Sequence, residues 1–160
     1  MVLDARHRFL ISHIFFNIQY RLLMISISTD KRAVTPREAA ELYIELGWGD
    51  EGQYAVPRMK RSLEHCDIVV SARNEAGELV GIARALSDFA IDTKILDMII
   101  DPDYQRQGIG KKMMRAIEKL ALGTTIYCET EQKNFDFVAS CGYGRRAGLV
   151  VFRKILPRRR

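Results

Sequence analysis

The clearest pattern of hydrophobic and polar positions lies near the middle of the chain. An apolar run at residues 95–100 ends just before Pro102, and Gly108 and Gly110 follow within a polar stretch. Apolar residues then recur with helical spacing at Ile109, Met113, Ile117 and Leu120. This pattern predicts a buried strand, a glycine-containing turn and an amphipathic helix, in that order.

Other segments predict further elements on both sides of this unit. Two β-rich runs at residues 67–73 and 79–86 flank a polar turn and predict a hairpin ahead of the central strand. Thr35 followed by Pro36 predicts the start of a helix, because a capping hydroxyl and a proline both favour a first helical turn. The remaining predicted elements are strands at residues 21–27 and 124–128 and a helix at residues 131–141.

Composition predicts a single globular domain. The 160 residues are 48% hydrophobic and 28% charged, which is ordinary for a globular protein. The 3 cysteines include no Cys-x-x-Cys pair and the 3 histidines show no metal-ligand spacing, so we expect neither a disulfide framework nor a metal site. This cysteine usage fits a reducing compartment, which we expect to be the cytoplasm.

The ends of the chain predict three regions. Residues 1–20 are an N-terminal extension of unknown role, residues 21–156 form the main domain, and residues 157–160 are a basic tail. The apolar run at residues 9–16 is shorter than the about 20 residues that a membrane span needs. No small-residue cleavage site of a signal peptide follows it. We therefore expect no membrane span and no secretion.

The formal net charge of +5 raises the question of a nucleic-acid partner. Lys111, Lys112 and Arg115 lie just after the glycine turn, where a phosphate group of a small ligand would account for them. The arginines of the tail are not interleaved with aromatic residues, as they are in many nucleic-acid-binding segments. We expect no nucleic-acid partner.

The glycine turn has the properties of an anion-binding loop. The first N–H groups of a helix have no partner within the helix, and together with the helix dipole they attract phosphate. The spacing excludes a Walker loop, because Gln105 stands where its first glycine belongs and Lys112 stands where its hydroxyl belongs. It also excludes the dinucleotide-binding fingerprint, whose third glycine is replaced by Met113.

The loop instead fits the pattern Gln/Arg-x-x-Gly-x-Gly/Ala, read here from Gln105 to Gly110. This resembles the acetyl-CoA pyrophosphate loop of the GCN5-related N-acetyltransferases (GNAT family). The resemblance extends over residues 21–153. Within the family, residues 80–88 and the Gly47-Trp-Gly49 turn resemble a subgroup of small bacterial and plastid enzymes, some of which acetylate arylalkylamines or protein amines. The implied fold is α/β, a mixed and mainly antiparallel sheet flanked by helices.

The resemblance also implies a cosubstrate, a reaction and site residues. Acetyl would pass from acetyl-CoA to a primary amine by direct attack, without a metal, and a homodimer is plausible for the family. Backbone groups of the central strand would meet the pantetheine arm and the thioester, loop amides would hold the pyrophosphate, and two residues of the next helix would flank the thiol. The implied cofactor-binding residues are Met98, Ile99, Ile100, Gln105, Arg106, Gln107, Gly108, Ile109, Gly110, Lys111, Asn134 and Phe137.

The chemistry requires a group that takes a proton from the amine, because a free alkylamine has a pKa of about 10.4 and is mostly protonated at neutral pH. Carboxylates near strand ends are candidates, namely Asp97, Glu129, Glu131 and Asp88. Glu131 could equally serve a helix N-terminus and Glu129 could simply be solvated. Asp97 is the first choice, because an unpaired carboxylate among apolar neighbours would be costly to bury.

One position departs from the family pattern. Many members carry a tyrosine in a Phe-Tyr-x-x-x-Gly-Phe segment, where it protonates the departing thiolate. Residues 137–143 match this segment, but Val138 stands in the tyrosine's place. The sequence therefore predicts an N-acetyltransferase that lacks the usual acid. It leaves open the alternative of a catalytically weak protein that senses acyl-CoA.

Overall fold

The computed structural model describes residues 25–148 and Lys154. Of these, the residues up to Glu129 form one compact unit and those from Thr130 onward form another, and each is described by itself. The predicted extension at residues 1–20 and the basic tail at residues 157–160 lie outside the described residues.

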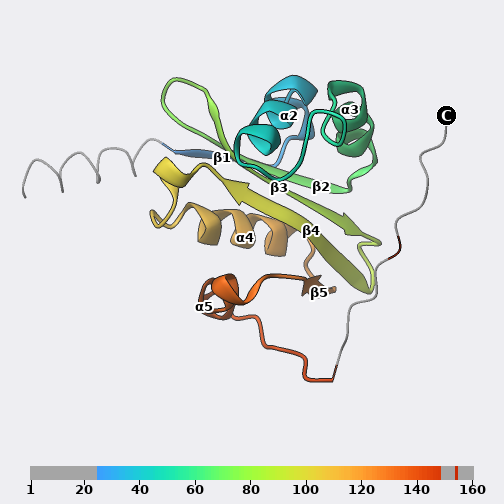
Figure 1. The fold of residues 1–160 in the computed structure, drawn as a ribbon. Coiled ribbons are helices and arrows are strands. Elements are labelled where there is room, and N and C mark those ends of the chain that lie inside the picture. Colours follow the sequence, from blue (N-terminus) through green and yellow to red (C-terminus); the bar gives the residue numbers. More distant parts are fainter. Residues whose placement is uncertain (1–24, 149–153, 155–160) are drawn as a thin grey trace, which may run out of the picture. The chain divides into compact units, whose positions relative to one another are not determined.

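The first unit is built on a sheet of five strands in the order β1-β2-β3-β4-β5 (Figure 1). Neighbouring strands are antiparallel, except for β4 and β5, which are parallel. This confirms the predicted mixed, mainly antiparallel sheet. The strands are β1 (Ser26–Ser28), β2 (Ile68–Arg73), β3 (Leu79–Ser87), β4 (Asp92–Ile100) and β5 (Thr125–Cys128).

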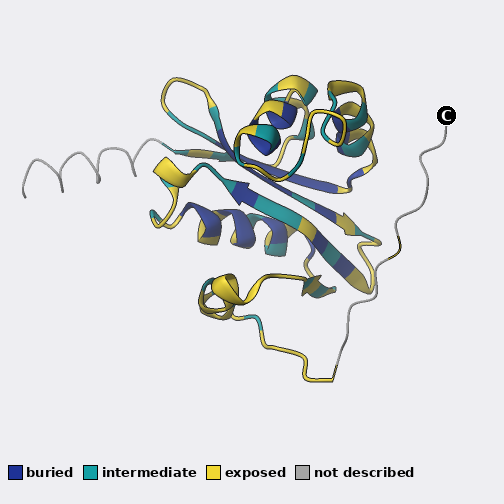
Figure 2. Cartoon of the chain, viewed as in Figure 1, coloured by how far each residue is buried: buried dark blue, intermediate teal, exposed yellow. Residues whose placement is uncertain are grey.

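Helices cover both faces of this sheet. Figure 1 shows α2 (Pro36–Glu45) and α3 (Val56–His65) on one face and α4 (Ile109–Leu120) on the other. Short 3-10 turns, η1 (Lys31–Ala33) and η2 (Pro102–Tyr104), lead into α2 and toward α4. The buried residues lie between the helices and the sheet (Figure 2), so there is one core on each face. No helix among the described residues is both long and apolar enough to cross a membrane.

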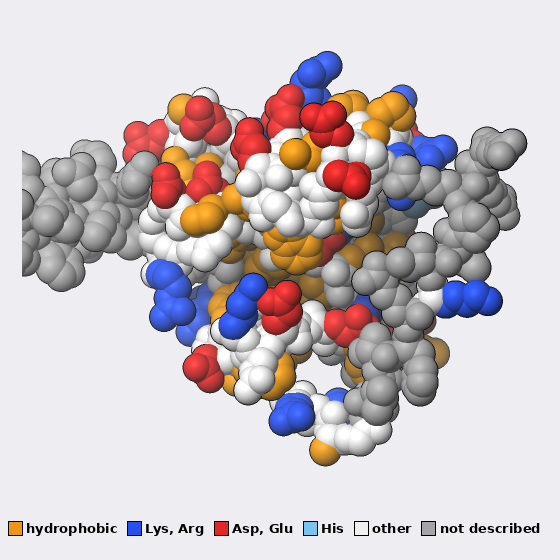
Figure 3. All heavy atoms as spheres, viewed as in Figure 1, with side chains coloured by type: hydrophobic (Ala, Val, Ile, Leu, Met, Phe, Trp, Pro, Cys, Tyr) orange, Lys and Arg blue, Asp and Glu red, His pale blue; other side chains and the backbone are white. Residues whose placement is uncertain are grey.

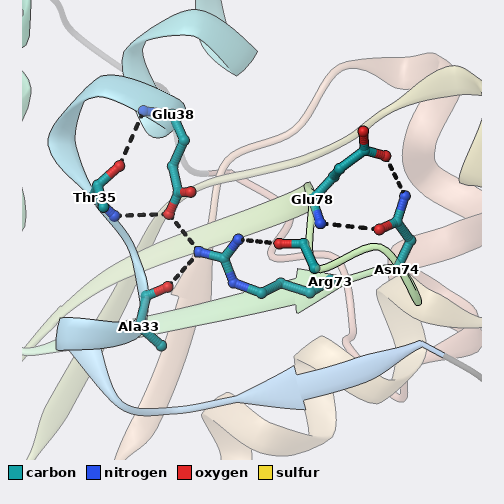
Figure 4. Close-up of polar contacts among 7 residues, drawn as sticks. Ala33, Thr35, Glu38, Arg73, Asn74 and Glu78 are labelled. Atoms are coloured by element: carbon teal, nitrogen blue, oxygen red, sulfur yellow. Dashed lines mark hydrogen bonds and ion pairs between the residues drawn. The ribbon is translucent and has the colours of Figure 1, made fainter.

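The start of α2 agrees with the sequence prediction. Thr35 accepts a hydrogen bond from the N–H of Glu38, and the Glu38 carboxylate accepts one from the N–H of Thr35 at 2.7 Å, which forms a capping box ahead of Pro36. Arg73, at the end of β2, donates to the same carboxylate and to the carbonyl of Ala33 (Figure 4). The helix is therefore fixed to the sheet at its first turn.

The helix after the glycine turn also forms as predicted, with one difference. Ile109, Met113 and Ile117 are buried against the sheet, as the spacing predicts. Leu120, in contrast, is 43% exposed, whereas Met114, which the spacing did not include, is buried. The apolar stripe therefore ends one turn earlier than the spacing predicts, because the helix ends at Leu120 itself.

β4 is longer than the apolar run that predicted it. It begins at Asp92, three residues before Ile95, and includes the fully buried Thr93. The Thr93 hydroxyl lies 2.7 Å from the hydroxyl of Ser87 and 2.8 Å from that of Thr124. A polar residue that is hydrogen-bonded on both sides can be buried at little cost, which is why hydrophobicity alone misplaces the start of this strand.

The second unit contains short helical turns instead of the single helix predicted at residues 131–141. A 3-10 turn, η3 (Gln132–Asn134), is followed by α5 (Phe135–Ser140), and neither contains a buried residue. Gly142 closes the segment with a left-handed φ of 91°, as its position after a helix favours. The prediction of one continuous helix is therefore wrong for residues 131–134.

Candidate active site

The site is built on the second half of β4, where one edge of the strand is open. β3 pairs with β4 as far as Ile100, whereas β5 pairs with Asp92–Ile95. On the side of β5, no described strand pairs with residues 96–100. Backbone N–H and C=O groups along an unpaired edge are available to a ligand in the way that they would be to another strand.

A β-bulge lies at the point where β5 stops pairing. Arg84 is opposite Asp97, but the next residue, Ala85, is opposite Ile95, so β4 has one extra residue, Leu96. Bulges bend a strand and redirect its side chains, and they are frequent beside active sites. Here the bulge separates the part of β4 that pairs with β5 from the part with the open edge.

The hydrogen-bond alternation decides which backbone groups face this edge. Asp101 donates its N–H to the carbonyl of Val80 at 2.9 Å. In an antiparallel ladder, alternate residues bond to the same neighbour, so Ile99 and Asp97 also direct their backbone groups toward β3. Met98 and Ile100 direct theirs toward the open edge. The expectation that Ile99 offers a backbone group to the cosubstrate is therefore wrong; its side chain is 2% exposed and belongs to the core.

The loop between β4 and α4 presents several N–H groups to one side. Arg106 and Gly108 both have left-handed backbones, with φ of 61° and 79°. Left-handed residues alternating with right-handed ones make a concave nest of N–H groups that suits an anion. Among the described residues, no hydrogen bond accepts the N–H of any residue from 106 to 111. A Cβ added at Gly108 would meet no heavy atom within 4 Å, so the loop faces open space there.

Two glutamine side chains hold this loop in place. Gln105 donates through Nε2 to the carbonyl of Ile100 at 2.8 Å, which ties the loop to the end of β4. Gln107 donates through Nε2 to the carbonyl of Asp103 at 2.9 Å, and its Oε1 is buried with no hydrogen-bond partner among the described residues. Both predicted residues therefore lie in the loop, and the side chain of each stabilises the loop backbone by a hydrogen bond.

Positive charge surrounds the nest. Arg106, Lys111, Lys112 and Arg115 are all exposed, and none of them forms an ion pair with any residue of 25–148 or with Lys154. Unpartnered N–H groups, a helix N-terminus and unpaired cations are the donors that a diphosphate requires. The residues present fit the diphosphate of coenzyme A. Among the described residues, no group of His, Cys, Asp and Glu is arranged to hold a metal ion.

Asp97, the first-choice base, is not unpaired. Its Oδ1 accepts from the Tyr43 hydroxyl at 2.5 Å and from Arg84 Nε at 3.1 Å, and its Oδ2 accepts from Arg84 Nη2. Arg84 also donates through Nη1 to the hydroxyl of Ser62. The Asp97 and Arg84 side chains are 7% and 12% exposed. The sequence-based argument from an unpaired carboxylate is therefore wrong, although Asp97 does lie beside the open edge.

The ring of Tyr43 lies against this ion pair and packs on two further aromatic rings. The Arg84 guanidinium lies 5.1 Å from the ring centroid of Tyr43, and Tyr54 stacks on Tyr43 at 4.6 Å. Burial, with the negative charge of Asp97 as a second cause, raises the pKa of Tyr43 well above its usual value. Trp48 contacts Tyr43 edge-on at 6.1 Å and remains 48% exposed. Tyr43 thus contacts both the ion pair and a partly exposed aromatic ring.

The other predicted carboxylates are more exposed. Glu129, just after β5, pairs with Lys94 and its side chain is 57% exposed. Glu131, in the second unit, pairs with Lys133 at 2.6 Å and is 71% exposed. Asp88 caps the β3–β4 turn, where its Oδ1 accepts backbone N–H groups from residues 90, 91 and 92, and these hydrogen bonds lower its pKa. Asp88 is therefore a turn residue and not a site residue.

Three further predicted site residues belong to the second unit. Asn134 lies at the end of η3, and Phe137 and Val138 lie in α5, both half-buried. Their expected roles near the thiol of the cosubstrate stay predictions. Sequence reasoning missed Arg84, Ser62 and the hydrogen bond from Tyr43 to Asp97. The signal for Arg84 was present, since it is the single charged residue in the otherwise apolar segment 79–86.

The comparison with known proteins gives the family of a chain that has this open strand edge and this loop of unpartnered N–H groups. The family model for the acetyltransferase (GNAT) family matches residues 34–143. The chain belongs to this family. The match runs from α2 to α5 and includes both the loop and the Arg84–Asp97 pair.

Individual relatives agree with this assignment. The chain is 37% identical over 70 residues to a soybean (Glycine max) protein named histone acetyltransferase TAP1, which covers 41% of this chain and 30% of that protein's length. It is 30% identical over 114 residues to the N-acetyltransferase ycf52 of Porphyra purpurea, covering 69% and 62%. The chain thus spans less than a third of the soybean relative. Among solved structures, the GNAT family protein SP0256 from Streptococcus pneumoniae matches with a TM-score of 0.68 at 25% identity, over 82% of this chain and 100% of that one.

Proposed function

We propose that this protein transfers an acetyl group from acetyl-CoA to a primary amine. The observation that carries the proposal is the continuity of two donor sets, the open edge of β4 at Met98 and Ile100 and the N–H nest at residues 106–111. Gln105 joins the two through its hydrogen bond to the Ile100 carbonyl. A long ligand with a diphosphate at one end and a carbonyl at the other matches this order of donors along the chain.

Each part of the site has a task in this reaction. The nest and the cations beside it bind the diphosphate. Acetyl-CoA, when bound, supplies an acyl group activated as a thioester. The backbone N–H of Met98 faces the open edge, where it can donate to the acyl oxygen as negative charge develops there. A preorganised donor of this kind contributes about 2.7–4 kcal/mol to transition-state stabilisation in other acyl-transfer enzymes.

A proton must also leave the attacking amine. Asp97 is occupied by Arg84 and Tyr43, so we assign this role to an exposed carboxylate. Of the two predicted exposed carboxylates, Glu129 and Glu131, Glu129 is the first candidate, because it follows β5 directly and belongs to the same unit as the open edge. Its side chain is largely exposed, so it can pass the proton to water. Glu131 is the second candidate.

The acceptor we propose is a cationic amine, either a small amine or a protein amine. Figure 3 shows acidic side chains gathered at the top of the view, where α2 and α3 lie in Figure 1. The exposed acidic residues of α2 and of the segment after it are Glu41, Glu45, Asp50 and Glu51. Such a surface raises the local concentration of cations. The half-exposed Trp48 could receive an aromatic group of an arylalkylamine, and the histone acetyltransferase relative favours a protein lysine.

Ligand-dependent melting tests the proposal at its first step. A ligand that binds only the native state adds about 2.7 kcal/mol of stability at a hundredfold excess over its Kd. We expect CoA and acetyl-CoA to raise Tm, with ADP and NAD as controls for any diphosphate. The second step is CoA release in the presence of arylalkylamines, polyamines and lysine peptides. An unchanged Tm at millimolar CoA contradicts the proposal.

A second function is favoured by one observation, the valine at position 138. Without a proton donor for the departing thiolate, the chain could bind acyl-CoA and report its level without useful turnover. Binding with no transfer to any amine of the panel, above the uncatalysed rate, would support this sensor function. Transfer to even one amine would exclude it.

Two further proposals concern the setting of the protein. We propose that it acts in the cytoplasm, where acetyl-CoA is present and thiols stay reduced. We also propose a homodimer, which light scattering coupled to gel filtration would detect as a mass of twice 18.3 kDa. Localisation of a tagged protein by microscopy tests the first proposal.

A further inference from the structure

We infer that Arg84 and Asp97, held by Tyr43, are positioning residues that fix the β4 bulge and thereby aim the Met98 N–H at the acyl group. The inference rests on the proposed acetyl transfer. Arg84 had no predicted role, and Asp97 was predicted to be the base. In this inference Asp97 fixes the conformation of β4 and does not accept a proton from the amine.

The contacts of the ion pair come from four different elements. Tyr43 of α2 and Ser62 of α3 approach from the helical layer, and Arg84 of β3 and Asp97 of β4 lie opposite each other in the sheet. Arg84 binds the carboxylate through Nε and Nη2 together, a two-point contact that fixes the orientation of both side chains. The network therefore connects the two helices to one specific position of β4.

That position is the first residue pair after the bulge. Leu96 is the extra residue, and Asp97 opposite Arg84 is where regular pairing resumes. A slip of one residue would turn every following side chain to the other face of the sheet and exchange the backbone groups that face β3 with those that face the open edge. Met98 would then donate to β3, and Ile99 would face the ligand. The two-point contact with Arg84 prevents this slip.

The same contacts disfavour Asp97 as a base. Its carboxylate accepts three hydrogen bonds, two on Oδ1 and one on Oδ2, and its side chain is 7% exposed. A general base must come within hydrogen-bond distance of the proton that it removes. Tyr43 is fully buried, so it cannot make way for an amine without opening the core. A carboxylate held in this way orients its surroundings better than it exchanges protons.

Tyr43→Phe tests the inference, with Tyr54→Phe as the matched control. Tyr43→Phe removes one hydrogen bond to Asp97 and keeps the ring, whereas Tyr54 stacks on Tyr43 and its hydroxyl makes no hydrogen bond to a described residue. We expect Tyr43→Phe to lower kcat roughly tenfold, the size expected for one hydrogen bond, with unchanged Kd for CoA. Tyr54→Phe should leave kcat unchanged.

Two measurements separate positioning from the other roles. The pH profile of kcat/KM should keep its shape in Tyr43→Phe. If the carboxylate were instead the general base, the variant would remove a hydrogen-bond donor to its ionised form, and the acid limb of the profile would move to higher pH. Hydrogen exchange of the Ile99 amide, which faces β3, should become faster in Tyr43→Phe and stay as in wild type in Tyr54→Phe. A displaced acid limb, or equal exchange and equal kcat in the two variants, overturns the inference.

The exchange measurement also separates this inference from the proposed function. If the wild-type protein binds CoA but acetylates no amine, acetyl transfer is wrong, while faster Ile99 exchange in Tyr43→Phe alone still supports the control of β4 by the ion pair. If transfer is observed and Ile99 exchange is the same in both variants, the proposed function stands and the positioning role is excluded.

Discussion

Arg73 and Glu38 lie in different layers of the fold and are joined by an ion pair that closes the first turn of α2. The Glu38 carboxylate accepts from Arg73 and, at the same time, from the backbone N–H of Thr35 (Figure 4). Arg73 also donates to the carbonyl of Gly77 at 2.7 Å, which belongs to the turn after β2. One guanidinium therefore couples the β2–β3 turn to the start of the helix that carries Tyr43.

We expect Glu38→Ala to lower the free energy of unfolding by about 1–2 kcal/mol, because it removes half of a capping box and an ion-pair partner of Arg73. Glu41→Ala is the control. Its carboxylate lies in the same helix, 3.8 Å from Arg37, and is 57% exposed, so the loss should stay below about 0.5 kcal/mol. Urea unfolding of the two variants measures the difference; equal losses would mean that Glu38 is only a surface residue.

Gly108→Ala should abolish CoA binding, whereas Gly77→Ala should not. Both glycines have a left-handed φ, 79° and 80°, and a Cβ at either position meets nothing within 4 Å. The backbone strain should cost each variant about 1–2 kcal/mol of stability. Only Gly108 lies in the N–H nest, so only its Cβ would occupy space that the diphosphate needs. Calorimetric titration with CoA measures the affinity of each variant. Equal affinity in both variants would show that the loop is a turn that does not bind the diphosphate.

Val138→Tyr should raise kcat for acetyl transfer if the site lacks only its acid, by up to about 100-fold, the lower range of general-acid catalysis. Val138→Phe is the control, since it adds the ring without the hydroxyl. The gain should appear in kcat with little change in the KM for acetyl-CoA. If the two variants behave alike, the hydroxyl does not reach the leaving group.

Asp88→Ala should destabilise the protein in a pH-dependent way. Three backbone N–H groups lower the pKa of Asp88 below 3.8 in the folded state. A carboxylate with a lowered pKa contributes stability at every pH above its unfolded value, and this contribution is lost as pH falls through the folded value. The difference in urea midpoint between wild type and Asp88→Ala should therefore be constant near neutrality and shrink below pH 3.8.

A control for this pH dependence lies in the same turn. The Asp92 carboxylate makes no hydrogen bond to a described residue, although its N–H donates to Asp88. Asp92→Ala should show no comparable loss at neutral pH. A loss in Asp88→Ala that persists unchanged below pH 3.8 would mean that the turn depends on side-chain packing and not on the charge.

Local sequence signals predicted most of the fold because they act over short distances. Thr35, Pro36 and Glu38 form a capping box that is visible as a motif, and the spacing of Ile109, Met113 and Ile117 is visible as a helical face. These features depend on residues three or four positions apart. The glycine loop is equally local, so the sequence located it between β4 and α4, and its binding of an anion stays a prediction.

The Asp97 network could not be predicted in this way. Tyr43 and Asp97 are 54 positions apart, and the partners come together only because α2 packs on the sheet and a bulge turns Asp97 toward it. Position in an apolar run shows that a carboxylate will be buried, but not which residue will neutralise it. For the same reason the alternation of backbone groups at Met98 and Ile99 depends on a register that Leu96 shifts by one residue.

The order of the strands also has a consequence for folding kinetics. β2, β3 and β4 are joined by short turns, whereas β5 reaches β4 through the whole of α4 and lies parallel to it. Contacts between distant residues form late because loop closure must precede them. We expect Ile126→Ala in β5 to accelerate unfolding with little effect on the folding rate, as stopped-flow measurements in urea would show. Until β5 docks, β4 is an edge strand along its full length, so the segment to which we assign acetyl-CoA binding is also the segment most exposed to mispairing during folding.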